Sequence, residues 1–197
     1  MNNIDEVIKQ NIDDQINCLK MIREKNTEKI KNVFDVLKKC KEKQNTIYIL
    51  GNGGSASTAS HFASDLLKTG ILENENRFRV ISLTDNTPVI LAWGNDESFD
   101  NIFVQQLKNF VKEEDVVIGI SGSGNSKNVL NAIDFANKTN VMTISFTGND
   151  GGELAKISKL NLNIPSNDML TIESMHLVIC HLLLTIIRNT GNPMFKY

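Results

Sequence analysis

The sequence predicts an α/β fold: a doubly wound, three-layer sandwich with a five-stranded parallel sheet. Short apolar or β-branched segments alternate with amphipathic segments along most of the chain, as in successive β–α–β units. Two of the apolar segments run into glycine- and serine-rich loops that open a helix, the arrangement found at the carboxyl ends of parallel strands. No linker or repeat divides the 197 residues, so we expect one domain, 1–197, with a helical pair at 1–44 and an α/β core at 45–197.

Composition excludes several classes of function. The net charge is −2 and the basic residues are scattered, which argues against binding to nucleic acid. Three widely spaced cysteines, an odd number, indicate reduced thiols and hence the cytoplasm. The first residues do not look like a signal peptide, and the longest apolar run, 177–187, is interrupted by His181 and Thr185. We therefore expect a cytoplasmic protein without a membrane or nucleic-acid partner.

The N-terminal segment predicts two amphipathic helices. Apolar residues in 4–22 recur every three or four positions and form one stripe: Ile4, Val7, Ile8, Ile12, Ile16, Leu19 and Ile22. A second helix begins after Asn26 and ends in the lysine-rich segment 38–43. A minimal α/β unit has no place for this pair, so we expect the helices to pack between the subunits of a homo-oligomer. The alternative is that they cover one face of the sheet.

The first strand, 47–50, leads into a glycine loop, Gly51-Asn52-Gly53-Gly54-Ser55. A helix beginning near Ser55 would point its free N–H groups and the positive end of its dipole at the loop, which suits a phosphate group. The loop matches neither the dinucleotide fingerprint nor the Walker lysine motif, so no nucleotide cofactor is expected. His61 and Asp65, four residues apart, share one face of this helix.

The remaining elements follow in alternation. The first loop helix stops near Gly70, and further strands are expected at 78–83, 115–120, 140–146 and 160–164, with helices at 126–138, 151–158 and 169–188. The strand at 115–120 leads into the second loop, where three serines fall within six positions, 121–126. Their hydroxyls and the nearby backbone N–H groups can hold a phosphate. By pattern alone, Asn95 and Asp96 suit a plain turn.

Taken together, these motifs resemble the sugar isomerase (SIS) domain family, and within it the phosphoheptose isomerases. The shared features are the Gly-Asn-Gly-Gly-Ser loop, His61-Phe62-Ala63, the Asn95-Asp96 pair, the serine-rich Ser-Gly-Asn-Ser turn and a late helix with a Glu or Gln followed by His. The resemblance runs in register from about residue 5 to about residue 190. It implies an SIS-type fold, a homotetramer and an aldose–ketose isomerase.

The resemblance also implies roles for residues. The substrate would be held by Asn52, Gly53, Gly54, Ser55, Asn95, Asp96, Ser121, Gly122, Ser123 and Ser126. The catalytic acid–base groups would be Asp65, Glu173 and His181. One zinc ion per subunit would be bound by His61, Asp65, Glu173 and His181.

This chain departs from the family at two of these positions. Asp65 stands where a glutamate is typical, and unless the helix shifts its carboxylate would fall roughly 1 Å or more short of the reach a base needs. Glu173 stands where glutamine is common, and its charge would strengthen metal binding or let it replace Asp65 as the base. Glu173 and His181 are also about 12 Å apart along one regular helix. Either the helix begins after Glu173, or the site is shared between subunits.

The expected activity is isomerisation of D-sedoheptulose 7-phosphate to D-glycero-D-manno-heptose 7-phosphate by proton transfer through an enediol. Two alternatives remain open. One is a non-catalytic protein of the same fold that binds a protein partner, like the replication-initiator-associating protein that the chain also resembles. The other is a related isomerase or etherase that acts on another sugar phosphate, such as an amino-sugar phosphate or a muramic acid ether.

Overall fold

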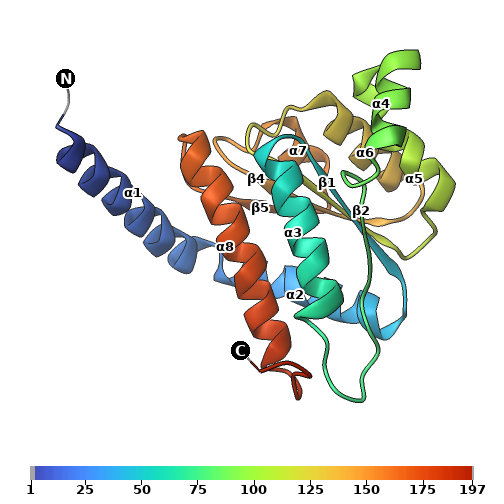
Figure 1. Ribbon diagram of the computed structural model, residues 1–197, viewed down its shortest axis with the longest axis horizontal. Helices are drawn as coiled ribbons and strands as arrows, with labels where there is room; N and C mark the ends of the chain where they lie inside the picture. Colours follow the sequence, from blue (N-terminus) through green and yellow to red (C-terminus); the bar gives the residue numbers. More distant parts are fainter. Residues whose placement is uncertain (1–2, 197) are drawn as a thin grey trace.

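A computed structural model describes residues 3–196 and contains one five-stranded parallel sheet, with the strand order β2-β1-β3-β4-β5 (Figure 1). The strands are β1 (Thr46–Gly51), β2 (Arg79–Ser82), β3 (Val116–Ser121), β4 (Met142–Thr147) and β5 (Leu160–Asn163). The helices are α1 (Ile4–Lys25), α2 (Thr27–Glu42), α3 (Gly54–Lys68), α4 (Thr87–Asp96), the 3-10 helix η1 (Phe99–Asn101), α5 (Val104–Phe110), α6 (Lys127–Lys138), α7 (Gly152–Ile157) and α8 (Met169–Arg188). The predicted fold class and strands are confirmed.

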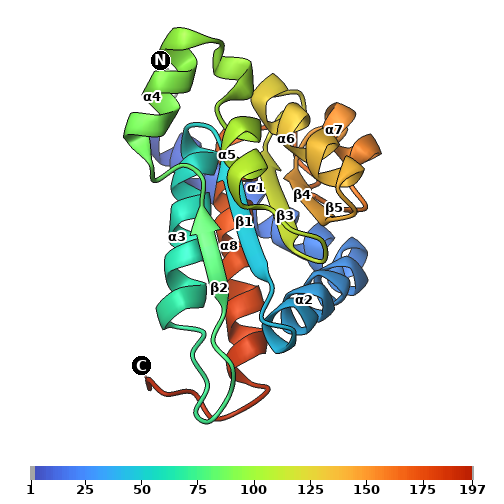
Figure 2. The same ribbon diagram turned by 90° about the vertical axis from the view of Figure 1, so that its right-hand side faces the viewer.

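Helices cover both faces of the sheet, as the doubly wound prediction requires (Figure 2). Alternate residues of β1 point to opposite faces, because side chains in a strand alternate. Ile47 and Ile49 belong to the core shared with α2, α3 and α8. Tyr48 and Leu50 belong to the second core, shared with α5, α6 and α7. The strand order places the β1–α3 and β3–α6 loops next to each other at the switch point of the sheet, where ligands bind in open α/β folds.

The two N-terminal helices have different surroundings. α2 buries Ile30, Val33 and Leu37 against the sheet and α8, so the alternative that the helix covers one face of the sheet is correct for α2. α1 projects from the body (Figure 1), and among its residues only Cys18 and Ile22, near its end, are buried. The rest of its apolar stripe is exposed: Ile4, Val7, Ile8, Ile12, Ile16 and Leu19.

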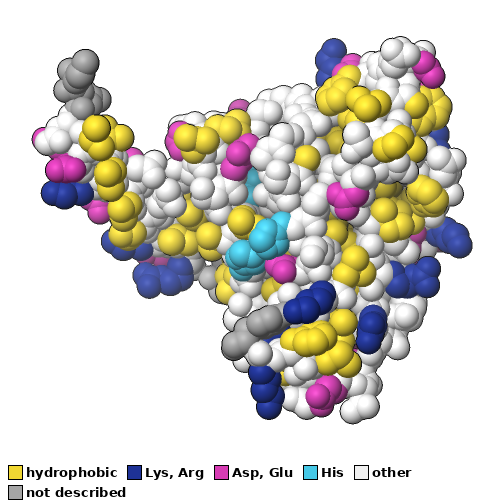
Figure 3. Space-filling view, viewed as in Figure 1, with side chains coloured by type: hydrophobic (Ala, Val, Ile, Leu, Met, Phe, Trp, Pro, Cys, Tyr) yellow, Lys and Arg dark blue, Asp and Glu magenta, His cyan; other side chains and the backbone are white. Residues whose placement is uncertain are grey.

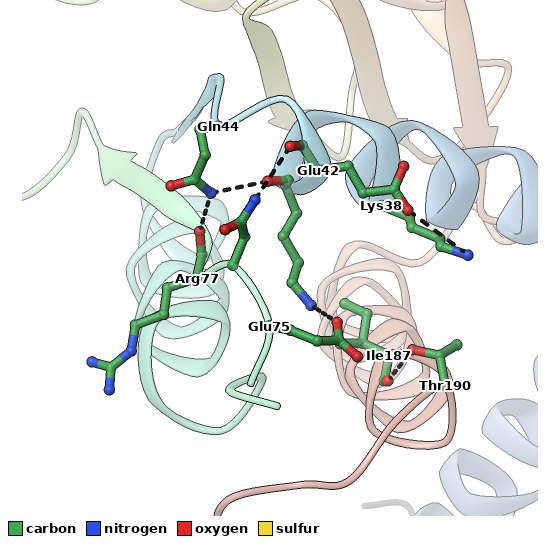
Figure 4. A network of polar contacts seen from close by, with 9 residues as sticks. Lys38, Glu42, Gln44, Glu75, Arg77, Ile187 and Thr190 are labelled. Atoms are coloured by element: carbon green, nitrogen blue, oxygen red, sulfur yellow. Dashed lines mark hydrogen bonds and ion pairs between the residues drawn. The ribbon is translucent and has the colours of Figure 1, made fainter. Parts of the chain in front are cut away.

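A polar network fastens the long α3–β2 connection to α2 (Figure 4). The ammonium group of Lys41, whose side chain is only 8% exposed, lies 2.6 Å from the Glu75 carboxylate and 5.5 Å from the centre of the Phe78 ring. The Gln44 amide donates to the Arg77 carbonyl at 3.0 Å. Because a buried ammonium group is stable only when paired, this network holds the connection in one position.

The helix α8 is long and apolar enough, by length and composition alone, to cross a membrane. Half of its apolar window is buried in the protein, however, where it packs against α2 and α3 as a core helix does. Its observed bounds coincide with the predicted 169–188. The helix therefore includes Glu173, so the explanation that it begins after Glu173 is wrong.

The segment 87–110 is more helical than its sequence pattern predicts. Asn95 and Asp96 end α4, which starts at the Asn86 cap and Pro88, and η1 and α5 follow. The apolar residues of α4 are consecutive rather than spaced at helical intervals, and none of the residues of α4 is buried. Only the half-buried Ile90 and Trp93 pack against the core, so the sequence of α4 lacks the periodicity by which an amphipathic helix is recognised.

Candidate active site

The first loop connects β1 to α3 through a tight turn. Gly53 has φ +55°, a value that side chains other than glycine's rarely allow. At Gly51, a Cβ atom would lie 2.9 Å from the Ile120 carbonyl oxygen, so only glycine lets the two neighbouring strands end this close together. The loop thus exposes the amino end of α3, and Ser55, which is buried, lies in the first turn of that helix. This geometry suits an anion.

The second loop brings two of its serine hydroxyls together. The Ser121 and Ser126 hydroxyl oxygens are 3.2 Å apart, and Ser123 accepts a hydrogen bond from the backbone N–H of Asn125. Gly124 has φ +66°, and a Cβ atom there would lie 2.1 Å from the Gly151 carbonyl oxygen. The loop is therefore packed tightly against the start of α7. We call the two loops together, residues 51–55 and 121–126, the phosphate cradle.

The start of α8 lies over both loops. A Cβ atom on Gly122 would lie 2.4 Å from the Met169 sulfur. A Cβ atom on Gly54 would lie 2.2 Å from Oε2 of Glu173, so this carboxylate reaches the amino end of α3. A carboxylate is favourable at that position because of the partial positive charge of the helix end. Glu173 is therefore placed beside the cradle.

The second polar centre is formed by His61, Asp65 and His181. The two Nε2 atoms are 3.1 Å apart, and Oδ2 of Asp65 lies 3.4 Å from Nε2 of His61 and 3.6 Å from Nε2 of His181. The other oxygen of Asp65 accepts a hydrogen bond from the Thr69 hydroxyl at 3.3 Å. Figure 3 shows histidine side chains at the surface with an acidic side chain beside them. We call these three residues the His-Asp cluster.

The cluster has the composition and spacing of a metal site. Two imidazole nitrogens and one carboxylate oxygen are common zinc ligands, and a catalytic zinc keeps a further position open. With zinc–ligand distances of 2.0–2.1 Å, neighbouring ligands of a tetrahedral ion are roughly 3.3 Å apart. The observed separations of 3.1, 3.4 and 3.6 Å are close to this value. The described residues thus bring together three of the four predicted zinc ligands.

The fourth predicted ligand, Glu173, is not part of this cluster. It lies two turns earlier on the same regular helix, about 12 Å away along its axis. Asn95 and Asp96 also lie apart. The Asn95 amide donates to the Asp96 carboxylate at 2.7 Å at the exposed end of α4, which packs mainly against η1. The predicted residues are therefore divided among three places in one subunit.

Two buried residues of α8 have shifted pKa values. Burial lowers the pKa of His176 to about 4, and its Nε2 atom lies 3.1 Å from the Thr147 carbonyl oxygen at the end of β4. The neutral ring anchors α8 to the sheet. Burial also raises the pKa of the Cys180 thiol, as does the nearby Asp65 carboxylate to a smaller extent. Cys180 therefore remains a neutral thiol that packs in the core.

Residues 10–148 match the SIS domain family. The chain belongs to this family. It is 38% identical over 180 residues to a phosphoheptose isomerase of Helicobacter pylori, covering 91% of this chain and 93% of the relative. It is 42% identical over 146 residues to one from Aliarcobacter butzleri, covering 74% of this chain and 76% of the relative. This SIS chain therefore also belongs with the phosphoheptose isomerases, as the sequence motifs predicted.

Solved structures give the same result. The structure of a phosphoheptose isomerase from Neisseria gonorrhoeae superimposes with a TM-score of 0.89 at 28% identity, covering 95% of this chain and all of that chain. The match includes the SIS-type sheet, and its extent leaves little of either chain outside the common fold. The two loops and the His-Asp cluster thus belong to an isomerase fold.

Proposed function

We propose that the protein is an aldose–ketose isomerase that converts D-sedoheptulose 7-phosphate into D-glycero-D-manno-heptose 7-phosphate. The observation that carries this proposal is the presence of two distinct centres in one SIS chain: a cradle suited to phosphate and a cluster of proton-transfer groups. The kinship with phosphoheptose isomerases supports both the reaction and the substrate. The three cysteines are buried and unpaired, which is consistent with the cytoplasm as its location.

In the proposed mechanism, the cradle binds the phosphate of the open-chain sugar through the hydroxyls of Ser55, Ser121, Ser123 and Ser126 and through nearby backbone N–H groups. Asn52, Asn95 and Asp96 align the sugar hydroxyls. A carboxylate, Asp65 or Glu173, removes a proton from the carbon next to the carbonyl, and His181 moves a proton at the oxygens. The proton returns to the adjacent carbon, which exchanges the positions of the carbonyl and the hydroxyl.

The His-Asp cluster suits a divalent metal, and we propose zinc. Its first ligands would be His61, Asp65 and His181. A bound zinc ion would polarise the carbonyl and stabilise the negative charge of the enediolate. The role of the chain's own residues is to hold the three donor atoms together: Thr69 steadies the Asp65 carboxylate, and the α3–α8 contact sets the distance between the two imidazoles.

We further propose that the complete site is shared between subunits of a tetramer. Glu173 is too far along α8 to join the cluster of its own subunit, so a Glu173 from a neighbour would supply the missing group. Two observations support an interface. On α8, Val178 and Leu182 are exposed near His181 and Leu170 is exposed at the start of the helix, and α1 carries its exposed apolar stripe. Exposed apolar surface of this extent is unusual for a soluble monomer.

Sedimentation of the purified protein tests the shared site. We expect an oligomer at micromolar concentration that dissociates when the α1 stripe is charged by Ile8→Glu with Ile12→Glu. Lys20→Glu, which adds negative charge elsewhere on the same helix, is the control and should leave the assembly intact. A stable wild-type monomer of 22.0 kDa would overturn the shared site.

Product analysis tests the reaction itself. Purified protein supplied with zinc is incubated with sedoheptulose 7-phosphate and, in parallel, with other ketose phosphates, amino-sugar phosphates and a muramic acid phosphate ether. The expected result is a heptose 7-phosphate formed only from the seven-carbon ketose. Turnover of another member of the panel would replace the substrate assignment, and turnover of none would favour the non-catalytic, partner-binding alternative.

A further inference from the structure

We infer that Asn128 is a positioning residue of the phosphate cradle, one that holds its two loops together and keeps the Ser126 hydroxyl available for the ligand. Asn128 lies outside the serine-rich motif itself, in the first turn of α6. Its side chain is not expected to touch the sugar phosphate, because it is engaged with the protein. The inference concerns how the cradle is built, and its link to turnover rests on the proposed function.

The contact between the loops is a reciprocal pair of amides. The Asn52 side-chain N–H donates to Oδ1 of Asn128 at 2.8 Å, and the Asn128 side-chain N–H donates to Oδ1 of Asn52 at 2.9 Å. The two residues are 76 positions apart in the chain, one in each loop region. Asn128 is 2% exposed, so loss of Asn52 would leave the buried side-chain N–H of Asn128 without its acceptor. The pair therefore holds the β1–α3 loop against the start of α6.

The same Oδ1 atom has a second function at the amino end of α6. It accepts a hydrogen bond from the backbone N–H of Val129 at 2.9 Å. A serine that precedes a helix ordinarily accepts this kind of N–H with its own hydroxyl. Ser126 occupies the cap position but makes no such side-chain bond, and its hydroxyl instead lies 3.2 Å from that of Ser121. The Val129 N–H also donates to the Ser126 carbonyl oxygen at 3.1 Å, so Asn128 is its second acceptor. The Ser126 hydroxyl is left beside that of Ser121, where both can face a phosphate.

These contacts predict an effect on ground-state binding more than on chemistry. Without Asn128, the loops must be ordered when the phosphate binds, and Ser126 can turn to cap its own helix. Both changes weaken the hold on the phosphate, which is bound in the substrate and in the transition state alike. Uniform binding of this kind is reflected in KM rather than in kcat.

The test is a double-mutant cycle with Asn128→Ala, Asn52→Ala and the double variant, assayed by isomerisation. We expect Asn128→Ala to raise KM about tenfold while kcat stays within about threefold. We expect the double variant to be no worse than the poorer single variant, because the pair acts as one unit. The matched control is Asn131→Ala on the same helix, whose exposed amide donates to the Asp100 carbonyl, and it should behave as wild type. Additive effects in the double variant would overturn the inference.

Binding of inorganic phosphate, measured by calorimetry, keeps the test independent of turnover. Asn128→Ala should bind phosphate about tenfold more weakly than wild type and Asn131→Ala equally well. Asn128→Asp keeps the oxygen that accepts from Val129 and Asn52, so it should remain folded, yet its charge should also weaken phosphate binding. Unchanged phosphate affinity in both Asn128 variants would overturn the inference. A wild type that binds phosphate but isomerises no sugar would overturn the proposed function alone.

Discussion

The phosphate cradle and the His-Asp cluster are built in opposite ways. The cradle consists of backbone and short side chains at strand ends, and its polar groups contact one another or the start of α6: Ser121 with Ser126, and Asn52 with Asn128. The cluster consists of longer side chains on the surfaces of two helices. The His61 and His181 side chains are 46% and 51% exposed, against 19% for Asp65. The polar groups of the cradle are paired within the subunit, whereas the His-Asp cluster is open to the surface.

This difference fits two separate functions, phosphate binding by the cradle and proton transfer by the cluster. Binding a constant group such as phosphate benefits from a rigid, preorganised loop pair, which the parallel sheet provides at its switch point. Proton transfer needs groups that converge on the variable end of the sugar, and the open cluster leaves room for a metal, the substrate and a neighbouring subunit. Variants in the cluster should therefore lower kcat, while variants in the cradle should mainly raise KM.

The largest effect is expected at His181. His181→Gln removes both an acid–base group and a metal ligand, so kcat should fall on the order of a thousandfold. Steady-state kinetics with added zinc, together with a measurement of bound metal, separates the two losses. His176→Gln on the same helix is the comparison: its ring is buried away from the cluster, so its effect should appear in stability. Wild-type turnover in His181→Gln would contradict the role of the cluster.

The next effect identifies the base. If Asp65 is the base, Asp65→Asn should lower kcat on the order of a hundredfold, and Asp65→Glu should preserve or raise it, since the longer side chain restores reach. If Glu173 is the base instead, the two variants exchange their effects. Glu173→Gln should then abolish turnover, and Asp65→Asn should mainly weaken metal binding. Parallel kinetics and metal titration of the three variants decide between them. Full activity in both Asp65→Asn and Glu173→Gln would exclude the two carboxylates.

A smaller effect is expected from the cradle. Ser121→Ala with Ser126→Ala removes two hydroxyl donors to a charged phosphate and should raise KM about tenfold or more, with a lesser change in kcat. Competition by inorganic phosphate measures the same loss without turnover. Ser57→Ala, in the first turns of α3 but exposed, is a control outside the proposed set of ligands. An unchanged KM in the double variant would mean that the cradle is misplaced.

The smallest effect on turnover concerns the anchor of α8, because here the expected change is in stability rather than in kinetics. The pKa of His176 is lowered by burial to about 4 from its ordinary value of 6.5. The unfolded chain therefore takes up a proton at His176 as the pH falls below about 6.5, whereas the folded protein resists until about 4. Stability should fall across this window, by on the order of 3 kcal/mol in total.

Urea unfolding at pH 7 and pH 5 measures this dependence. His176→Leu should lose this part of the pH dependence, because leucine does not titrate. His181→Leu, at an exposed position of the same helix, serves as the matched comparison and should keep it. Equal pH dependence in wild type and His176→Leu would show that the buried ring does not titrate in this range.

The sequence by itself determined the local features of this protein. The alternation of strands and helices, both glycine and serine loops, and the full extent of α8 follow from periodicity and turn chemistry, which act over a few residues. The shared face of His61 and Asp65 also follows, because residues four apart on a helix lie together. Helix α4 could not be predicted from the sequence, because none of its residues is fully buried and its apolar residues show no helical period.

Tertiary structure decided which surfaces and residues these helices and loops contact. The stripes of α1 and α2 look alike in sequence, since a stripe predicts that a face will be buried but not what will cover it; only α2 lies against the sheet. His181 reaches His61 across 120 positions, and Asn128 reaches Asn52 across 76, because the helices and loops are brought together by the order of the strands. A regular helix has a fixed rise per residue, so the distance between Glu173 and His181 could be predicted from the sequence. The same distance keeps Glu173 beside the cradle and away from the His-Asp cluster.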